Sequence, residues 1–208
     1  QGYSSAASDV YKRQVVDSDY VIFVAEVAST CNEALLMQHL LKKTSDKKQR
    51  AYLINYFLEQ FRTTLYRQTM FAEFELKMSE LTANGESVNA ETATKVYHDL
   101  IDLYFGPDIV HDEYIDLEWA RIPHFYYNFY VYQYATGFSA AIALSQKILS
   151  EGESAVKAYK EKFLSAGCSK DPVSILKDAG VDMSTKKPVE QALALFNSLL
   201  DEMDELMK

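Results

Sequence analysis

The sequence FVAEVASTCNE, residues 23–33, decides how the rest of the chain can be read. Its apolar positions recur at helical spacing, and Glu26 and Glu33 stand seven residues apart, which is close to two helical turns. Both carboxylates are therefore expected on one face of a helix. The neighbouring residues Ala25, Ala28 and Ser29 are small and leave room for a group to approach the backbone. Two acids on one face are most often solvated, so these residues alone leave a surface pair and a metal-binding pair both open.

Helical periodicity and helix-ending residues continue along the chain, which predicts an all-α fold. No Asn-Gly or similar turn joins two alternating strands, so no hairpin is predicted. Gly137 lies in the helix predicted over residues 123–150 and is expected to let that helix pack closely against a neighbour. The predicted helices cover residues 20–43, 47–82 (stopped by Asn84-Gly85), 89–104 (capped by Asn89 and broken by Gly106-Pro107), 123–150, 153–166, a short helix capped by Asp171 and closed by Gly180, and 188 to the end, with a loop around Asp112 and Asp116.

Composition excludes several classes of protein. The 208 residues are 48% hydrophobic and 25% charged, which is typical of a globular chain. A formal charge of −9 argues against a nucleic-acid partner, because a phosphate backbone calls for a basic surface. No apolar run approaches the ~18 residues that span a bilayer, so no membrane partner is expected. Cys31 and Cys168 are far apart and form no CxxC pair, which argues against a disulfide framework and favours a reducing, cytoplasmic location.

Residues 1–14, QGYSSAASDVYKRQ, differ in character from the rest of the chain. They are polar and lack hydrophobic periodicity, and DVYKRQ resembles the translation of a transposon-end adaptor used in sequencing libraries. We therefore expect residues 1–14 to be a non-native or disordered leader and exclude them from fold reasoning. Residues 15–208 are then expected to form the C-terminal part of a single catalytic domain.

Three blocks in the chain resemble oligoendopeptidase F, a zinc metallopeptidase of the thimet oligopeptidase family. They are FVAEVASTCNEALL (residues 23–36), IPHFYYNFYVYQYATGFSAA (122–141) and AGVDMSTKKPVEQAL (179–193). The resemblance implies that the chain is the multi-helix C-terminal part of a helical zinc-peptidase catalytic domain. It also implies that Glu26 is the third ligand of one Zn2+ ion. The HExxH motif that supplies the two histidine ligands and the general base in this family is absent, because the four histidines of the chain stand singly.

The same resemblance implies roles for the aromatic block after Pro123. His124 is expected to contact the substrate and Tyr132 to stabilise the oxyanion, with Tyr127 and Tyr130 as further candidates. A tyrosine suits this role because its hydroxyl donates a hydrogen bond. On a continuous helix Tyr127 and Tyr130 share a face with Tyr134, whereas Tyr126 and Tyr132 point elsewhere, so the tyrosines cannot all serve. Core packing remains an alternative for each of them.

The sequence leaves two possible roles open for the Glu33 side chain. Two turns beyond Glu26, it is either a carboxylate that orients a zinc-bound histidine or a plain surface acid.

The function implied by the resemblance is zinc-dependent endopeptidase activity on short oligopeptides, with zinc-activated water as the nucleophile. With one of three ligands and no general base, this chain alone is expected to be inactive and to expose apolar surface. Its expected partners are oligopeptide substrates and the missing N-terminal part of the same protein. The alternatives are a non-catalytic all-α interaction module, such as a degenerate paralogue, and another zinc peptidase with a similar helix layout.

Overall fold

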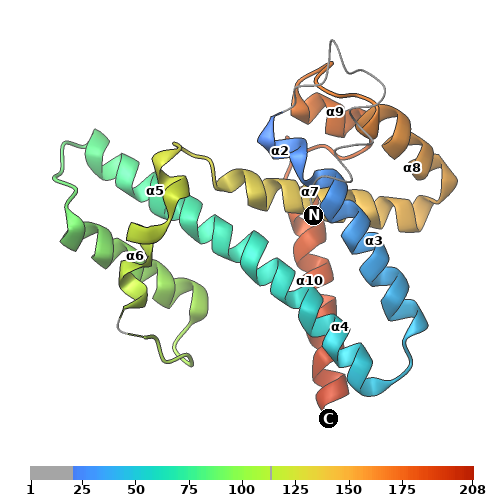
Figure 1. Ribbon diagram of the computed structural model, residues 1–208, viewed down its shortest axis with the longest axis horizontal. Coiled ribbons are helices and arrows are strands. Elements are labelled where there is room, and N and C mark those ends of the chain that lie inside the picture. Colours follow the sequence, from blue (N-terminus) through green and yellow to red (C-terminus); the bar gives the residue numbers. More distant parts are fainter. Residues whose placement is uncertain (1–20, 113) are drawn as a thin grey trace. The chain divides into compact units, whose positions relative to one another are not determined.

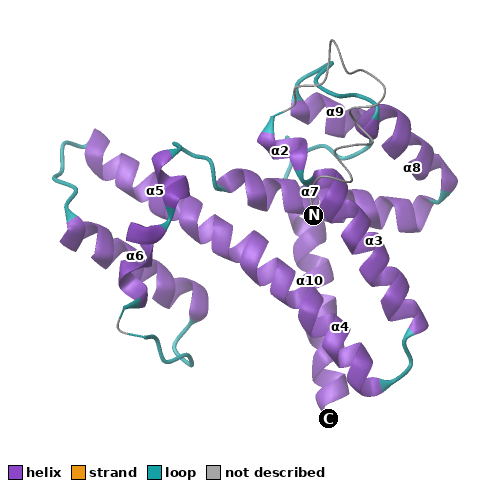
Figure 2. Cartoon of the chain, viewed as in Figure 1, coloured by secondary structure: helices purple, strands orange, loops and turns teal. Residues whose placement is uncertain are grey.

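The computed structural model describes residues 21–112 and 114–208, and every regular element among them is helical (Figures 1 and 2). The all-α prediction is confirmed. The predicted leader and the predicted helix start at residue 20 lie outside the described residues. The chain divides into two compact units. Unit 1 holds the described residues up to Leu65 together with Thr136–Lys208, and unit 2 is Tyr66–Ala135.

Unit 1 is built from helices at both ends of the described chain. Two of its elements cross the unit boundary, because the chain leaves unit 1 within η1 and returns to it within α7. No helix among the described ranges is long and apolar enough to cross a membrane. The elements are α2 (Ile22–Ala25), α3 (Val27–Lys43), α4 (Lys47–Gln60), the π-helix η1 (Phe61–Tyr66), α7 (Tyr132–Glu151), α8 (Glu153–Ala158), the π-helix η4 (Tyr159–Leu164), α9 (Pro172–Asp178) and α10 (Lys187–Met207).

The core of unit 1 joins α3 and α7 to the elements that come after α7. Small residues of α7, among them Ala140 and Ala141, pack with Val27 and Cys31 of α3, and Phe163 of η4 belongs to the same cluster. Burial raises the pKa of the Cys31 thiol to about 12, although a contact with Tyr159 lowers it. In the same unit, α4 lies against α3 and α10 (Figure 1).

The first helix differs from its prediction. A single helix over residues 20–43 was expected, but α2 ends at Ala25 and α3 begins at Val27. Glu26 stands between them with φ −101° and ψ −3°. Because this segment contains no glycine or proline, its sequence carried no signal for the break.

Unit 2 comprises α5 (Arg67–Ala83), α6 (Ala90–Phe105) and two short 3-10 helices, η2 (Ile115–Arg121) and η3 (Pro123–Tyr126). Helix α6 packs against both α5 and η2. Its N-terminus is capped by Asn89, whose side chain accepts a hydrogen bond from the Thr92 N–H at 2.9 Å. The buried side chains of this unit are mainly aromatic and aliphatic, with Phe71, Phe74 and Tyr97 at the centre.

The predicted start of the helix over residues 123–150 was also wrong. Residues 123–126 form the separate helix η3, and α7 starts only at Tyr132. Between them Phe129 has φ +54°, a left-handed conformation that no continuous right-handed helix contains. The loop predicted around Asp116 is likewise partly helical, because Asp116 lies in η2.

The remaining helix predictions are confirmed with small changes. The predicted helix over residues 47–82 runs through α4, η1 and α5, with π-helical turns in η1. The one predicted over residues 153–166 is α8 followed by η4. Asp171 caps α9 by accepting a hydrogen bond from the Ser174 N–H at 2.9 Å, and Gly180, with φ +98°, comes just after its end.

Candidate functional site

Glu26 lies at the joint between α2 and α3 in unit 1. Its backbone carbonyl accepts hydrogen bonds from the Thr30 N–H and the Ser29 hydroxyl, each at 3.0 Å, which starts α3. Val27 and Ala28 are buried directly after it and anchor the helix. The Glu26 side chain is exposed, and no hydrogen bond or ion pair to its carboxylate is found among the described residues.

Gly137 of α7 approaches the residues just before Glu26. A Cβ built on Gly137 would lie 3.0 Å from the carbonyl oxygen of Phe23 and 3.7 Å from a methyl group of Val27. The prediction that this glycine serves close helix packing is confirmed. The two elements that flank Glu26 are thus both held against α7.

Glu33 is exposed on α3, one residue before the buried Ala34. Its carboxylate accepts a long hydrogen bond of 3.5 Å from the Gln60 side chain of α4. Nothing in this contact assigns it to a metal site, so its role remains a prediction.

The predicted aromatic residues form a stack in unit 2. The His124 ring stacks on Tyr130 with the ring centroids 5.6 Å apart, and Tyr134 meets both rings edge-on. Tyr127 adds a tilted contact with Tyr130 at 6.2 Å. The structure therefore brings His124, Tyr127, Tyr130 and Tyr134 together, but not on the continuous helix that the shared-face prediction assumed, because Tyr127 and Tyr130 belong to no helix. Tyr132 is the first residue of α7 and about half exposed.

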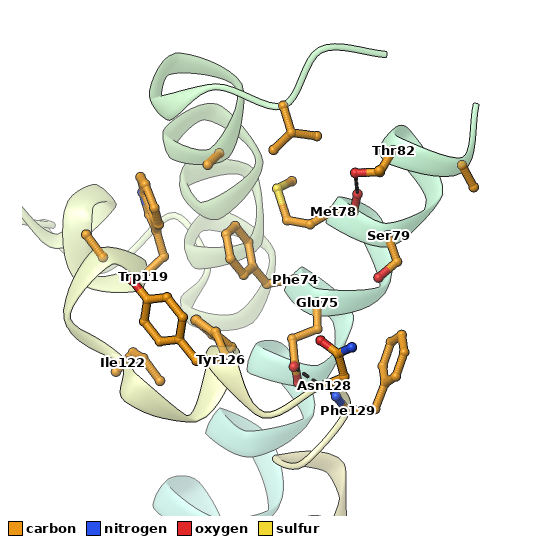
Figure 3. A pocket seen from close by; sticks show the side chains of 15 residues that line it. Phe74, Glu75, Met78, Ser79, Thr82, Trp119, Ile122, Tyr126, Asn128 and Phe129 are labelled. Atoms are coloured by element: carbon orange, nitrogen blue, oxygen red, sulfur yellow. Dashed lines mark hydrogen bonds between the residues drawn. The ribbon is translucent and has the colours of Figure 1, made fainter. Parts of the chain in front are cut away.

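A pocket of about 590 Å³ opens beside this aromatic segment within unit 2 (Figure 3). Apolar side chains dominate its lining, with Phe74 and Met78 from α5 and Trp119 from η2 among them. Glu75 is the acidic residue of the lining and has only 8% of its surface exposed. Its Oε1 accepts a hydrogen bond of 3.1 Å from the Phe129 N–H (Figure 3). The bond fixes the backbone at the residue with positive φ.

A second buried carboxylate, Glu118, lies in η2 and is fully paired. The Tyr97 hydroxyl donates to its Oε2 at 2.7 Å, and the guanidinium groups of Arg67 and Arg121 both bind Oε1. Burial works to raise the pKa of Glu118, but these three partners outweigh it and hold the pKa below its usual value. This network ties η2 to α5 and α6.

A metal ion fits this chain only in part. Zinc takes carboxylate oxygen as a ligand, and the unpaired, exposed carboxylate of Glu26 meets that requirement. Over residues 21–112 and 114–208, no group of three or more histidine, cysteine, aspartate or glutamate side chains is arranged to hold a metal ion. The described residues therefore place no second potential ligand set beside Glu26, and its assignment to a metal site stays a prediction.

The profile of peptidase family M3 matches residues 4–195 of the sequence. The chain belongs to this family. It is 56% identical to oligopeptidase PepF of Bacillus subtilis over 189 residues, which are 91% of this chain and 28% of that protein. It is 43% identical to the chromosomal oligoendopeptidase F of Lactococcus lactis subsp. cremoris, covering 93% of this chain and 32% of the relative. This M3 chain thus spans about a third of the length of the curated relatives it matches.

Solved structures agree with this assignment. The crystal structure of oligoendopeptidase-F from Enterococcus faecium matches 99% of the M3 chain with a TM-score of 0.89 at 41% identity, over 38% of its own chain. The crystal structure of a putative peptidase from Chlamydophila abortus matches with a TM-score of 0.88 at 37% identity, over 35% of its own chain. The resemblance to oligoendopeptidase F and the fold it implied are confirmed.

The burial of Glu75 and Glu118 in this M3 chain was not predicted from the sequence. Glu75 comes four residues after Phe71 and three before Met78, so it stands on the apolar face of α5. An acid on an apolar stripe was a usable signal. Glu118 gave a weaker one, because its burial depends on arginines that only the folded chain brings to it.

Proposed function

We propose that the complete protein is a zinc-dependent endopeptidase that hydrolyses short oligopeptides through a zinc-activated water molecule. The observation that supports it is the match to oligoendopeptidase-F from Enterococcus faecium over 99% of this chain. Zinc, when bound, would lower the pKa of its water into the neutral range and polarise the scissile carbonyl. Glu26 would hold that ion with its free carboxylate. We place the protein in the cytoplasm.

The aromatic segment of unit 2 would act on the substrate rather than on the metal. We assign substrate contact to His124 and oxyanion stabilisation to Tyr132, with Tyr127 and Tyr130 as further donors. A hydroxyl held in a fixed position stabilises the negative charge that develops on the attacked carbonyl oxygen. The stack of His124, Tyr130 and Tyr134 supports this assignment because it restrains the rings before substrate arrives.

Glu33 would orient one of the histidines that complete the zinc site. Such partners fix the tautomer and the direction of a ligating ring. The long contact with Gln60 leaves the Glu33 carboxylate with acceptor capacity for that role.

The chain as given would need the N-terminal part of the same protein as its partner. The described residues hold no group of three potential metal ligands, so we expect neither tight zinc binding nor peptide cleavage from this chain alone. Equilibrium dialysis and a quenched fluorescent peptide measure the two properties. Stoichiometric tight zinc, or turnover, would contradict the assignment.

A chimera tests the proposed roles. The matched 189 residues of Bacillus subtilis oligopeptidase PepF would be replaced by the corresponding part of this chain, and zinc content and peptide cleavage measured. Glu26→Gln should lose the zinc and almost all cleavage, because the amide is a poor ligand. Glu33→Gln should keep the zinc site and lose roughly 10- to 100-fold in metal affinity or activity.

The outcome for each variant separates the alternatives. A folded chimera with Glu26→Gln that retains zinc removes Glu26 from the ligand set. A folded parent chimera that binds zinc but cleaves nothing would favour the interaction-module alternative. An unchanged Glu33→Gln variant would make Glu33 a plain surface acid.

A further inference from the structure

The pocket in unit 2 contains a buried carboxyl group that is only half satisfied. Glu75 Oε1 has the Phe129 N–H, but Oε2 has no hydrogen-bond partner among the described residues and is shielded from solvent. Burial raises the pKa of Glu75, and the single backbone donor only partly opposes this. Buried polar atoms normally have a partner. The unpartnered oxygen therefore marks a place where a donor is missing.

The surroundings define what kind of donor fits. The pocket volume of about 590 Å³ lies in the range of small-molecule sites, which are mostly apolar with a few polar groups. Phe74, Trp119 and Phe125 line it, and Figure 3 shows the Glu75 carboxyl group beside Asn128 and Phe129, with Phe74 between Glu75 and Trp119. The lining contains no lysine, arginine or histidine. Aromatic faces attract cations, and a carboxylate attracts them more strongly.

We propose that this pocket binds an organic ammonium ion, with the apolar body of the ligand against the aromatic lining and its ammonium group donating to the Glu75 carboxyl group, which turns on its side chain to bring Oε2 to the ligand. A primary amine on an aromatic or aliphatic body has this chemistry. The amine can belong to a small molecule or to the N-terminus of a peptide that begins with an apolar residue. The proposal concerns residues of unit 2 only and requires neither zinc nor peptidase activity.

Three simpler occupants of the pocket fit its lining less well. A neutral apolar molecule would fill the volume but leave Oε2 unpaired. An anion would be repelled by Glu75. A water molecule would satisfy Oε2 but leave the apolar walls without contacts. A donor joined to an apolar body meets both needs, and an ammonium donor adds a charge that a neutral hydroxyl lacks.

The chain provides its own probe for binding. Trp119 is its single tryptophan and lines the pocket, so intrinsic fluorescence reports occupancy. We would titrate the full chain with 2-phenylethylamine and, separately, with 2-phenylethanol, which has a similar shape but no charge. The amine is expected to bind about tenfold tighter or more, as a charge-assisted hydrogen bond to a buried group predicts. Phenylalaninamide, a mimic of a peptide N-terminus, should bind as tightly as the amine if peptides are the source and more weakly if small amines are.

Variants test whether Glu75 carries the selectivity. Glu75→Gln should bring the affinity for the amine down to that for the alcohol. Glu80→Gln, an exposed acid on the same helix α5, is the matched control and should leave both affinities unchanged. Ser79→Phe, at an exposed position of the lining, should fill the mouth of the pocket and weaken both ligands.

The proposal is overturned by wild-type protein that binds both probes equally or shows no saturable change in Trp119 fluorescence. It is also overturned if a folded Glu75→Gln variant keeps the preference for the amine. Circular dichroism shows whether Glu75→Gln folds. If it does not, the proposal is tested by the affinities of wild-type protein for the two probes and by their loss in Ser79→Phe.

Discussion

The buried carboxylate of Glu118 has two arginine partners that contribute unequally to the stability of the fold. Arg67 and Arg121 bind the same oxygen, but the Arg67 side chain is 27% exposed and that of Arg121 is 71% exposed. We expect Arg67→Met to lower the free energy of unfolding by about 2 to 3 kcal/mol, because it leaves a buried charge underpaired. Arg121→Met should cost less than about 1 kcal/mol, as exposed ion pairs do. Urea denaturation of both variants measures the difference, and equal losses would contradict this ranking.

A titratable ion pair links α6 to η2. His98 of α6 contacts Asp116 of η2 at 3.0 Å and Asp102 of its own helix at 3.4 Å. The hydrogen bond to Asp116 and the nearby carboxylates raise the pKa of His98. A raised pKa means that the imidazolium stabilises the fold fully below the unfolded value near 6.5, and that this stabilisation is lost as the pH rises through the folded value. Urea midpoints between pH 5 and 9 should therefore separate wild type from His98→Gln at low pH and converge at high pH, whereas a gap that stays constant would contradict the assignment.

The elements also show what the sequence could and could not predict. Caps such as Asn89 and Asp171 act on neighbouring residues, so the helix starts they predict were confirmed. The break at Glu26 and the left-handed Phe129 were missed because distant residues stabilise them. Phe129 donates its N–H to Glu75, which is 54 residues away in the sequence. Glu75 is a different case, because its position on the apolar face of α5 indicated burial, whereas its Phe129 partner could not be read from the local pattern.

At the scale of the whole molecule, exposed apolar side chains predict self-association. Tyr52 and Tyr56 lie one turn apart on α4 with 70% and 51% of their surface exposed, and Leu36 of α3 is also exposed. Large exposed apolar surfaces usually mark contacts with another chain or segment. We expect the average mass measured by light scattering to rise with protein concentration, and to rise less in the double variant Tyr52→Lys, Tyr56→Lys.

A charge-matched variant controls that experiment. Ser150→Lys with Ser198→Lys adds the same two charges at exposed polar positions and should associate like wild type. A wild-type chain that stays monomeric over the whole concentration range would show that these side chains tolerate solvent.

Glu26 owes its position to packing rather than to helix formation. Helix α2 has only four residues, and a single turn is unstable by itself because nucleation costs more conformational entropy than one hydrogen bond returns. Phe23 and Val24 pack against the core of unit 1, and α7 comes close enough at Gly137 to exclude a side chain. The backbone conformational entropy of residue 26 is therefore lost when unit 1 folds. In the proposed zinc site, an arriving cation would meet a glutamate whose backbone is already in place, so its affinity would not include that entropy loss.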